Sequence, residues 1–172
     1  MMDGRAAMSQ NRFSRRELIA GSACAAAAAV VIGAPGTARS SFQVTKSPAD
    51  WMRELGPARF AILREAGTEP PFSSSLNREH RRGTFACAGC ALPLFASSTK
   101  FDSGTGWPSF YKALPDAVLT KADYSFGMER TEVLCRRCGG HLGHVFPDGP
   151  KPTGLRYCTN GLALQFRSSA IS

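Results

Sequence analysis

Two Cys-x-x-Cys pairs, Cys87/Cys90 and Cys135/Cys138, constrain the fold of this chain more than any other feature of its 172 residues. A glycine lies within the first motif and directly after the second, so each backbone can form a tight turn that directs both sulfurs to one side. Two such turns supply four thiolates, which complete a tetrahedral metal site and leave no open coordination position. Because residues 91–134 separate the pairs, such a site ties together distant parts of the chain.

Zinc is the metal that a closed set of four cysteine sulfurs favours, and iron in the same cage is the alternative. Two other interpretations remain: each pair could form a disulfide, or each could be a dithiol redox motif. The redox interpretation is the weaker one, because no thioredoxin-like βαβ pattern accompanies either motif. The sequence therefore predicts one structural Zn²⁺ bound by Cys87, Cys90, Cys135 and Cys138.

The first 40 residues have the pattern of an export signal. Arg15 and Arg16 precede an apolar, alanine-rich run at residues 18–31, and small residues follow. This order is typical of a twin-arginine signal peptide with cleavage after Ala38 or Ser40, and an uncleaved membrane anchor is the alternative. We therefore expect a periplasmic or exported protein, membrane-anchored if the signal is retained, with a signal peptide at 1–40, a linker at 41–47 and one domain at 48–172.

The charge distribution argues against a nucleic-acid partner. The formal net charge is +8, but beyond the signal the basic residues are scattered, apart from Arg81-Arg82 and Arg136-Arg137. No basic stripe interleaved with aromatic residues is present in the sequence.

The expected export route is compatible with a metal site made of free thiols. Passengers of the twin-arginine route cross the membrane folded, so the metal can load in the reducing cytoplasm before the thiols meet an oxidising space.

The domain begins with helical patterns and continues with strand patterns. Ser47-Pro48 is an N-cap followed by proline, Gly56 ends a first short helix, and Pro57 opens a second that stops at Gly67. Beyond these helices, short apolar runs alternate with Gly, Pro and Asp. We expect a mainly β domain of antiparallel strands with two helices in front of it, and candidate strands at 84–86, 118–120, 130–134, 142–146, 155–159 and 162–166.

Cys158 is the cysteine that the metal site leaves over, because Cys24 lies in the expected signal. In a strand alternate side chains share a face, so Arg156, Cys158 and Asn160 are expected on one side. A neighbouring guanidinium lowers the pKa of a thiol and favours the reactive thiolate. The alternative is a buried cysteine that acts as a small apolar residue, and the adjacent arginine disfavours it.

Two histidines, His141 and His144, offer acid–base chemistry. Residues three apart face opposite sides of a regular strand, so both reach one pocket only if Gly143 introduces an irregularity. Since sulfur already fills the expected metal site, proton transfer is the better interpretation for His141 and His144.

Two further features have less specific interpretations. His80, with no motif around it, is predicted to be a surface residue. The aromatic loop at 104–111 can form either an apolar wall for a ligand or part of the core.

Several motifs together resemble the methionine-R-sulfoxide reductases of the MsrB family, from about residue 48 to 166. They are Cys-Ala-Gly-Cys, Lys-Phe-Asp-Ser-Gly-Thr-Gly-Trp-Pro-Ser-Phe at 100–110, Cys-Gly-Gly-His-Leu-Gly-His-Val-Phe at 138–146, Asp-Gly-Pro at 148–150 and Pro-Thr-Gly-Leu-Arg-Tyr-Cys-Thr-Asn at 152–160. The resemblance implies a pair of antiparallel sheets, the β-tent of that family, behind N-terminal helices.

The same resemblance implies roles for individual residues. Cys158 attacks the sulfoxide sulfur and becomes a sulfenic acid. His141 and His144, helped by Asn160 through water, supply and position the proton that the departing oxygen needs. A second group surrounds these residues: Arg156 and Asp148 tune the thiolate, while Trp107 and Phe146 hold the substrate methyl group and so select one epimer.

Regeneration of the thiol requires an external reductant in this interpretation. Several family members carry a resolving cysteine where this chain has Thr105, and the other cysteines of the domain are assigned to the metal. The resemblance implies that a small thiol or a thioredoxin-like partner is the reductant, and that the substrate is oxidised methionine in proteins.

Two rival functions are a zinc-stabilised binding module and a thiol–disulfide exchange enzyme. The exchange enzyme would need a second redox-active thiol near Cys158.

Overall fold

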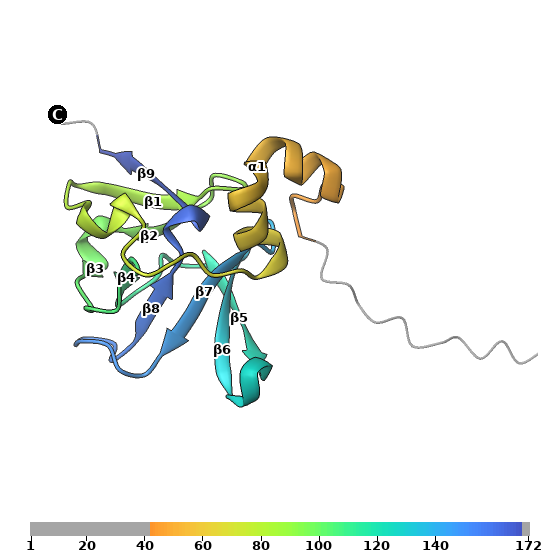
Figure 1. Ribbon diagram of the computed structural model, residues 1–172. Helices are drawn as coiled ribbons and strands as arrows, with labels where there is room; N and C mark the ends of the chain where they lie inside the picture. The colour runs from red at the N-terminus through yellow and green to blue at the C-terminus, as the bar shows by residue number, and fades with distance from the viewer. Residues whose placement is uncertain (1–41, 170–172) are drawn as a thin grey trace, which may run out of the picture. The chain divides into compact units, whose positions relative to one another are not determined.

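The computed structural model describes residues 42–169 (Figure 1). Residues 1–41 therefore lie outside the described residues, and with them the expected signal peptide, Cys24 and the first residue of the expected linker. Within 42–169, no helix combines the length and the apolar character needed to cross a bilayer.

A single kinked helix, α1 (Pro48–Glu65), stands where two helices were expected. Ser47 Oγ accepts a hydrogen bond from the backbone N–H of Asp50 at 3.1 Å, and Pro48 occupies the first turn, as predicted. At Gly56 the backbone leaves the helix (φ 70°, ψ 167°), so the predicted break is present within one continuous element. The helix ends at Ala66 in the left-handed conformation, one residue before the predicted stop.

The strands form two antiparallel sheets, which confirms the predicted fold class. The smaller sheet has the order β2-β1-β9, and the larger has the order β3-β4-β8-β7-β6-β5. Figure 1 shows α1 beside both sheets, and it contacts β7. The strands are β1 (Gly83–Cys87), β2 (Pro93–Ala96), β3 (Lys100–Phe101), β4 (Ser109–Phe110), β5 (Val118–Asp123), β6 (Arg130–Cys135), β7 (His141–Phe146), β8 (Arg156–Thr159) and β9 (Leu164–Ser168).

Short 3₁₀ turns connect these elements, and one of them corrects a predicted strand. They are η1 (Ser75–Arg78), η2 (Ser97–Thr99), η3 (Ser125–Gly127) and η4 (Gly161–Ala163). The predicted strand at 162–166 begins only at Leu164, because the carboxylate of Glu69 accepts the backbone N–H groups of Gly161 and Leu162 and holds them in η4.

The core that supports the sheets is rich in phenylalanine. Phe85, Phe95 and Phe110 are fully buried, and the rings of Phe95 and Phe110 stack with centroids 4.3 Å apart. Burial of one such side chain contributes roughly 1.5–3 kcal/mol. Phe85 lies in the smaller sheet and Phe110 in the larger, with centroids 4.9 Å apart, so this cluster joins the two sheets.

Candidate active site and metal centre

The four cysteines of the two Cys-x-x-Cys motifs meet in one cluster. Their Sγ atoms all lie within 4.8 Å of one another, with 3.7 Å between Cys87 and Cys138 and 3.5 Å between Cys90 and Cys135. A tetrahedron with Zn–S bonds of about 2.3 Å has S···S edges of about 3.8 Å, whereas a disulfide bond is about 2.05 Å. The donor set therefore fits a closed metal site.

Two turns position these sulfurs, one at the end of each sheet. The N–H of Ala91 donates to Cys87 O and the N–H of Gly139 donates to Cys135 O, both at 2.8 Å, which closes each turn. Cys87 ends β1 in the smaller sheet, and Cys135 ends β6 in the larger sheet. A metal bound here would join the two sheets and would have no direct part in chemistry at Cys158, which is outside the cluster.

A row of polar side chains crosses the larger sheet. In the strand register Lys121 pairs with Glu132, Glu132 with His144, and His144 with Cys158. Residues directly opposite each other in antiparallel strands project to the same face, with Cβ atoms about 4.5–5.5 Å apart. The register thus brings a histidine beside the thiol, and Ser109 of β4 is opposite Cys158 on its other side.

An irregularity in β7 brings the second histidine to the same region. The pairing of β6 with β7 shifts between Val133 and Leu134, and Gly143 adopts φ 152°. A Cβ atom at Gly143 would lie 2.0 Å from the carbonyl oxygen of Cys158, so only glycine fits. The rings of His141 and His144 consequently lie with centroids 5.5 Å apart, which confirms the predicted irregularity.

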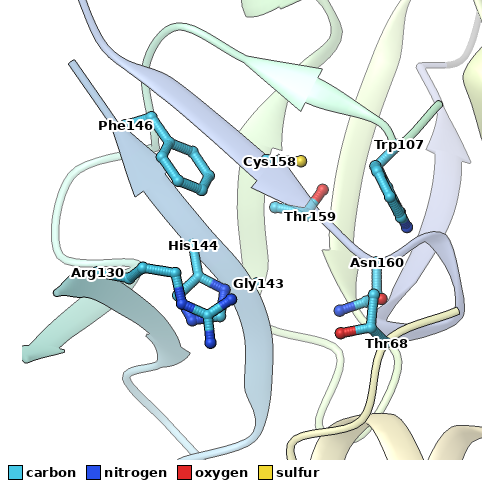
Figure 2. Close-up of a pocket in the computed structure, with 9 residues that line it drawn as sticks. All are labelled: Thr68, Trp107, Arg130, Gly143, His144, Phe146, Cys158, Thr159 and Asn160. Carbon is cyan, nitrogen blue, oxygen red and sulfur yellow. The ribbon is translucent and has the colours of Figure 1, made fainter. Parts of the chain in front are cut away.

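A pocket of about 110 Å³ opens onto the thiol. Figure 2 shows the Cys158 sulfur between Phe146 and Trp107, with His144 and Asn160 also on the pocket wall. Of the predicted site residues, His141, Arg156 and Asp148 are not part of this lining. The lining residues are Thr68, Trp107, Arg130, Gly143, His144, Phe146, Cys158, Thr159 and Asn160.

Arg156 forms the flank of the site with Asp148. Its Nε and Nη2 atoms donate to the two carboxylate oxygens of Asp148 at 2.9 and 2.8 Å, and its guanidinium lies 4.5 Å from the ring centre of Phe146. This bidentate pair fixes the arginine in place. The Asp148 carboxylate therefore partly neutralises the positive charge that was expected to act on Cys158 alone.

The expectation of a lowered thiol pKa is wrong for the free protein. Burial raises the pKa of Cys158, and this effect exceeds the lowering by the Thr105 hydroxyl, 3.9 Å from Sγ, and by Arg156. The negative charge of Asp148 raises the pKa further. Desolvation disfavours the charged form of a thiol, so the free protein holds this cysteine mainly as the neutral thiol.

Each histidine is paired with a carboxylate that the sequence reasoning missed. His141 Nδ1 lies 2.8 Å from Glu132 Oε1, and His144 Nε2 lies 2.8 Å from Asp123 Oδ2. An ionised carboxylate only accepts hydrogen bonds, so these ring nitrogens carry the hydrogens. Strand alternation places Glu132 on the same side of β6 as Arg130, but which histidine each carboxylate meets depends on the register of the neighbouring strands, which the sequence does not show.

Cations on neighbouring strands hold these carboxylates. Lys121 Nζ lies 3.0 Å from Glu132, and Arg130 Nη2 lies 2.8 Å from Asp123. Burial raises the pKa of Glu132, but hydrogen bonds from His141 and Lys121 outweigh it and leave that pKa below its ordinary value. For His141 the effect of burial dominates: burial lowers its pKa, although the hydrogen bond and the negative charge of Glu132 raise it. The pair therefore favours a neutral His141 beside an ionised Glu132.

A second groove, of about 530 Å³, reaches His144 from the side of these carboxylates. Asp123, Glu132, Lys121 and Arg130 line it, and His144 lines both this groove and the Cys158 pocket. Three residues, His144, Arg130 and Thr68, therefore lie between the pocket and this groove. His80 is exposed, in agreement with its predicted surface position.

Comparison with known proteins identifies the family. The SelR domain family matches residues 55–168. The peptide methionine sulfoxide reductase MsrB of Leptospira interrogans is 54% identical over 128 residues, which cover 74% of this chain and 98% of that protein. The MsrB protein of Bradyrhizobium diazoefficiens is 58% identical over 124 residues, covering 72% of this chain and 89% of that protein. This chain therefore belongs to the SelR domain family, together with these MsrB proteins.

Proposed function

We propose that this protein reduces the R epimer of methionine sulfoxide to methionine, with Cys158 as the nucleophile. The observation that carries the proposal is the position of Cys158 Sγ between two aromatic side chains, in a pocket whose wall also includes His144. Aromatic walls bind a methyl group, and a histidine can donate a proton to an oxygen atom. These two properties match the methyl group and the oxygen of a methyl sulfoxide.

The chemistry balances without any additional cofactor. The sulfur of Cys158 attacks the sulfoxide sulfur, and the thiol proton leaves through His144. His144 passes that proton to the sulfoxide oxygen, with His141 as its neighbour. The resulting hydroxyl group then moves to the Cys158 sulfur, and the substrate sulfur loses both its bond to oxygen and the S–S bond that the attack had formed. Methionine leaves and Cys158 becomes a sulfenic acid, so the substrate sulfur is reduced by two electrons and the cysteine sulfur is oxidised by two.

The size of the pocket supports a protein-bound substrate. About 110 Å³ is well below the roughly 300–1,000 Å³ of sites that enclose a whole drug-sized ligand. The pocket therefore accepts the end of a methionine side chain, and the rest of the substrate stays outside. Protein repair after oxidative damage is the function that follows.

Zinc is the metal we assign to the four-cysteine site, with a structural role. Cys87, Cys90, Cys135 and Cys138 would bind it, and it supplies cross-linking energy to the fold when bound. A closed tetrathiolate leaves no position for substrate, so the reaction depends on the side chains of the pocket alone.

The decisive experiment compares the separated R and S sulfoxides of an N-blocked methionine. We expect dithiothreitol-driven turnover of the R epimer by the wild type, little turnover of the S epimer, and none of either by Cys158→Ser. A Cys158→Ser variant that folds normally and retains full turnover would refute the role of this cysteine. A wild type without turnover would favour a zinc-stabilised binding module.

Regeneration of Cys158 is proposed to use an external thiol or a thioredoxin-like protein. Thr105 is the polar side chain at 3.9 Å from the sulfur, and the remaining cysteines within 42–169 form the metal cluster. After one turnover without reductant, mass spectrometry should find one added oxygen on Cys158. In Thr105→Cys the sulfenic acid should instead condense to an intramolecular disulfide. A disulfide in the wild type would support thiol–disulfide exchange and contradict the proposal.

Export through the twin-arginine pathway is a further part of the proposal, supported by the sequence pattern of residues 1–40. Folded, metal-loaded protein would then be delivered to the periplasm. Replacing both Arg15 and Arg16 by lysine should retain the protein in the cytoplasm in a fractionation experiment. Unchanged delivery of this double variant would contradict the proposed route.

A further inference from the structure

Glu69 is a buried acidic residue that the site predictions did not include. It lies between α1 and η1, and only 4% of its surface is exposed. Its carboxylate accepts the N–H groups of Gly161 and Leu162, the latter at 3.0 Å. These two donors compensate for the loss of water around a buried charge. They also belong to η4, the turn that directly follows Asn160.

The backbone of the same residue binds two side chains of the Cys158 pocket. The N–H of Glu69 donates to Asn160 Oδ1 at 2.9 Å, and the C=O of Glu69 accepts from Trp107 Nε1 at 3.0 Å. Asn160 and Trp107 come from different parts of the chain, and both line the pocket. Glu69 thus connects the aromatic wall of the pocket, at Trp107, to the amide group of Asn160.

The surroundings of this junction leave little freedom to move. A Cβ atom at Gly161 would lie 1.9 Å from Ser74 Oγ and 3.1 Å from Glu69 Oε1. The Asn160 Nδ2 group donates to Leu142 O at 3.3 Å, which sets the orientation of the amide opposite Glu69. Glu69 is therefore held through its side chain and in turn holds two pocket residues through its backbone.

We propose that Glu69 is a positioning residue, which fixes the Trp107 ring relative to the Asn160 amide and thereby sets the epimer preference of the pocket. This inference rests on the proposed reductase function. The two epimers of a sulfoxide differ in how methyl, oxygen and lone pair are arranged around sulfur. A pocket distinguishes them only if its apolar wall and its polar groups keep a fixed relative position.

Two substitutions disturb this arrangement in different ways. Glu69→Gln keeps the side-chain length but loses the charge and places an NH₂ group near two N–H donors. Glu69→Asp keeps the charge but is one methylene shorter, so its bonds to η4 pull on the backbone that holds Trp107 and Asn160. In both variants kcat/KM for the R epimer should fall at least about tenfold, and the ratio of R to S turnover should fall with it.

A spectroscopic readout separates positioning from general destabilisation. Hydrogen exchange of the Trp107 indole N–H, followed by NMR, should accelerate in the Glu69 variants, with the Trp51 indole as internal reference. Trp107→Phe removes the same bond from its other end and should also lower the R to S ratio. Glu65→Gln, an exposed carboxylate on the preceding helix, should match the wild type in every measurement.

The outcomes distinguish this inference from the proposed function. A wild type that turns over neither epimer overturns the reductase proposal itself. An active wild type whose Glu69 variants keep its R to S ratio and its slow Trp107 exchange overturns the positioning role alone. If Glu69→Gln does not fold, Glu69→Asp and Trp107→Phe supply the same comparison, and an unchanged ratio in either contradicts the inference.

Discussion

At the scale of single residues, the protonation state of Cys158, the proposed nucleophile, depends on a balance of charges around it. Burial keeps Cys158 protonated, the Arg156 guanidinium favours its thiolate, and Asp148 opposes that effect while holding Arg156 in place. A neutral resting thiol also resists accidental oxidation, because the thiolate is the reactive form. In the proposed reaction, the thiol is activated only in the complex with substrate, where His144 accepts its proton.

The first prediction concerns the carboxylate of Asp148. Asp148→Asn removes a negative charge that raises the pKa of Cys158, so that pKa should fall and the thiolate should form at lower pH. The rate of alkylation by iodoacetamide, measured against pH, should shift its midpoint downward. At neutral pH it should rise roughly two- to fivefold, the range of a partly exposed charge pair.

The matched control is Asp116→Asn, which neutralises an exposed aspartate in a loose pair with Arg136, 3.7 Å away. It should leave the alkylation profile unchanged. A profile of Asp148→Asn that coincides with the wild type, or that moves to higher pH, would show that Asp148 does not oppose thiolate formation.

At the scale of secondary-structure elements, the irregularity of β7 is the feature that assembles the site. The shift of register beside Gly143 allows His141 and His144 to serve the same region, although three residues separate them along the chain. Bulges of this kind often redirect side chains next to active sites. The element therefore has a function beyond its place in the sheet.

Gly143→Ala should disrupt this element. The added Cβ would meet the Cys158 carbonyl oxygen at 2.0 Å, and φ 152° is unfavourable for alanine. We expect a loss of at least about 2 kcal/mol in the free energy of unfolding, measured in urea, and loss of reductase activity. Gly56→Ala has positive φ but nothing within 4 Å of its Cβ, so it should cost about 1–3 kcal/mol and retain activity per folded molecule. Full activity of Gly143→Ala would exclude the proposed role of the bulge.

The sequence was informative where local rules determine structure. Chelating spacing identified the four metal-site cysteines, alternation suggested a common face for Arg156 and Cys158, and Gly143 marked the bulge. Glu69, Glu132 and Asp123 could not be found in this way, because their partners are distant in sequence and depend on strand register. The same tertiary contact, from Glu69 to η4, made Gly161 and Leu162 a turn where the local pattern favoured a strand.

At the scale of the whole molecule, the sulfur cluster joins the ends of β1 and β6 and so connects the two sheets. In small metal sites of this type, the binding free energy of the metal becomes folding free energy. The cluster and the phenylalanine core then both join the smaller sheet to the larger one.

Removal of the metal should therefore destabilise the entire domain. Cys90→Ser should lower the bound zinc and depress the midpoint of thermal unfolding, followed by circular dichroism. Cys158→Ser, outside the cluster, should bind one zinc and unfold at the wild-type temperature. The structural assignment fails if chelation strips the zinc from the wild type and the unfolding temperature does not change.

The row of Lys121, Glu132, His144 and Cys158 has a consequence for variation among related chains. Each strand contributes one member, and a one-residue slip of any strand turns its side chain to the opposite face of the sheet. A single deletion inside β6, β7 or β8 would thus abolish catalysis even where folding survives. Insertions in the connecting loops leave the row intact. Related chains should therefore differ in length mainly in those loops, and changes engineered to alter which oxidised proteins are bound should also be made there.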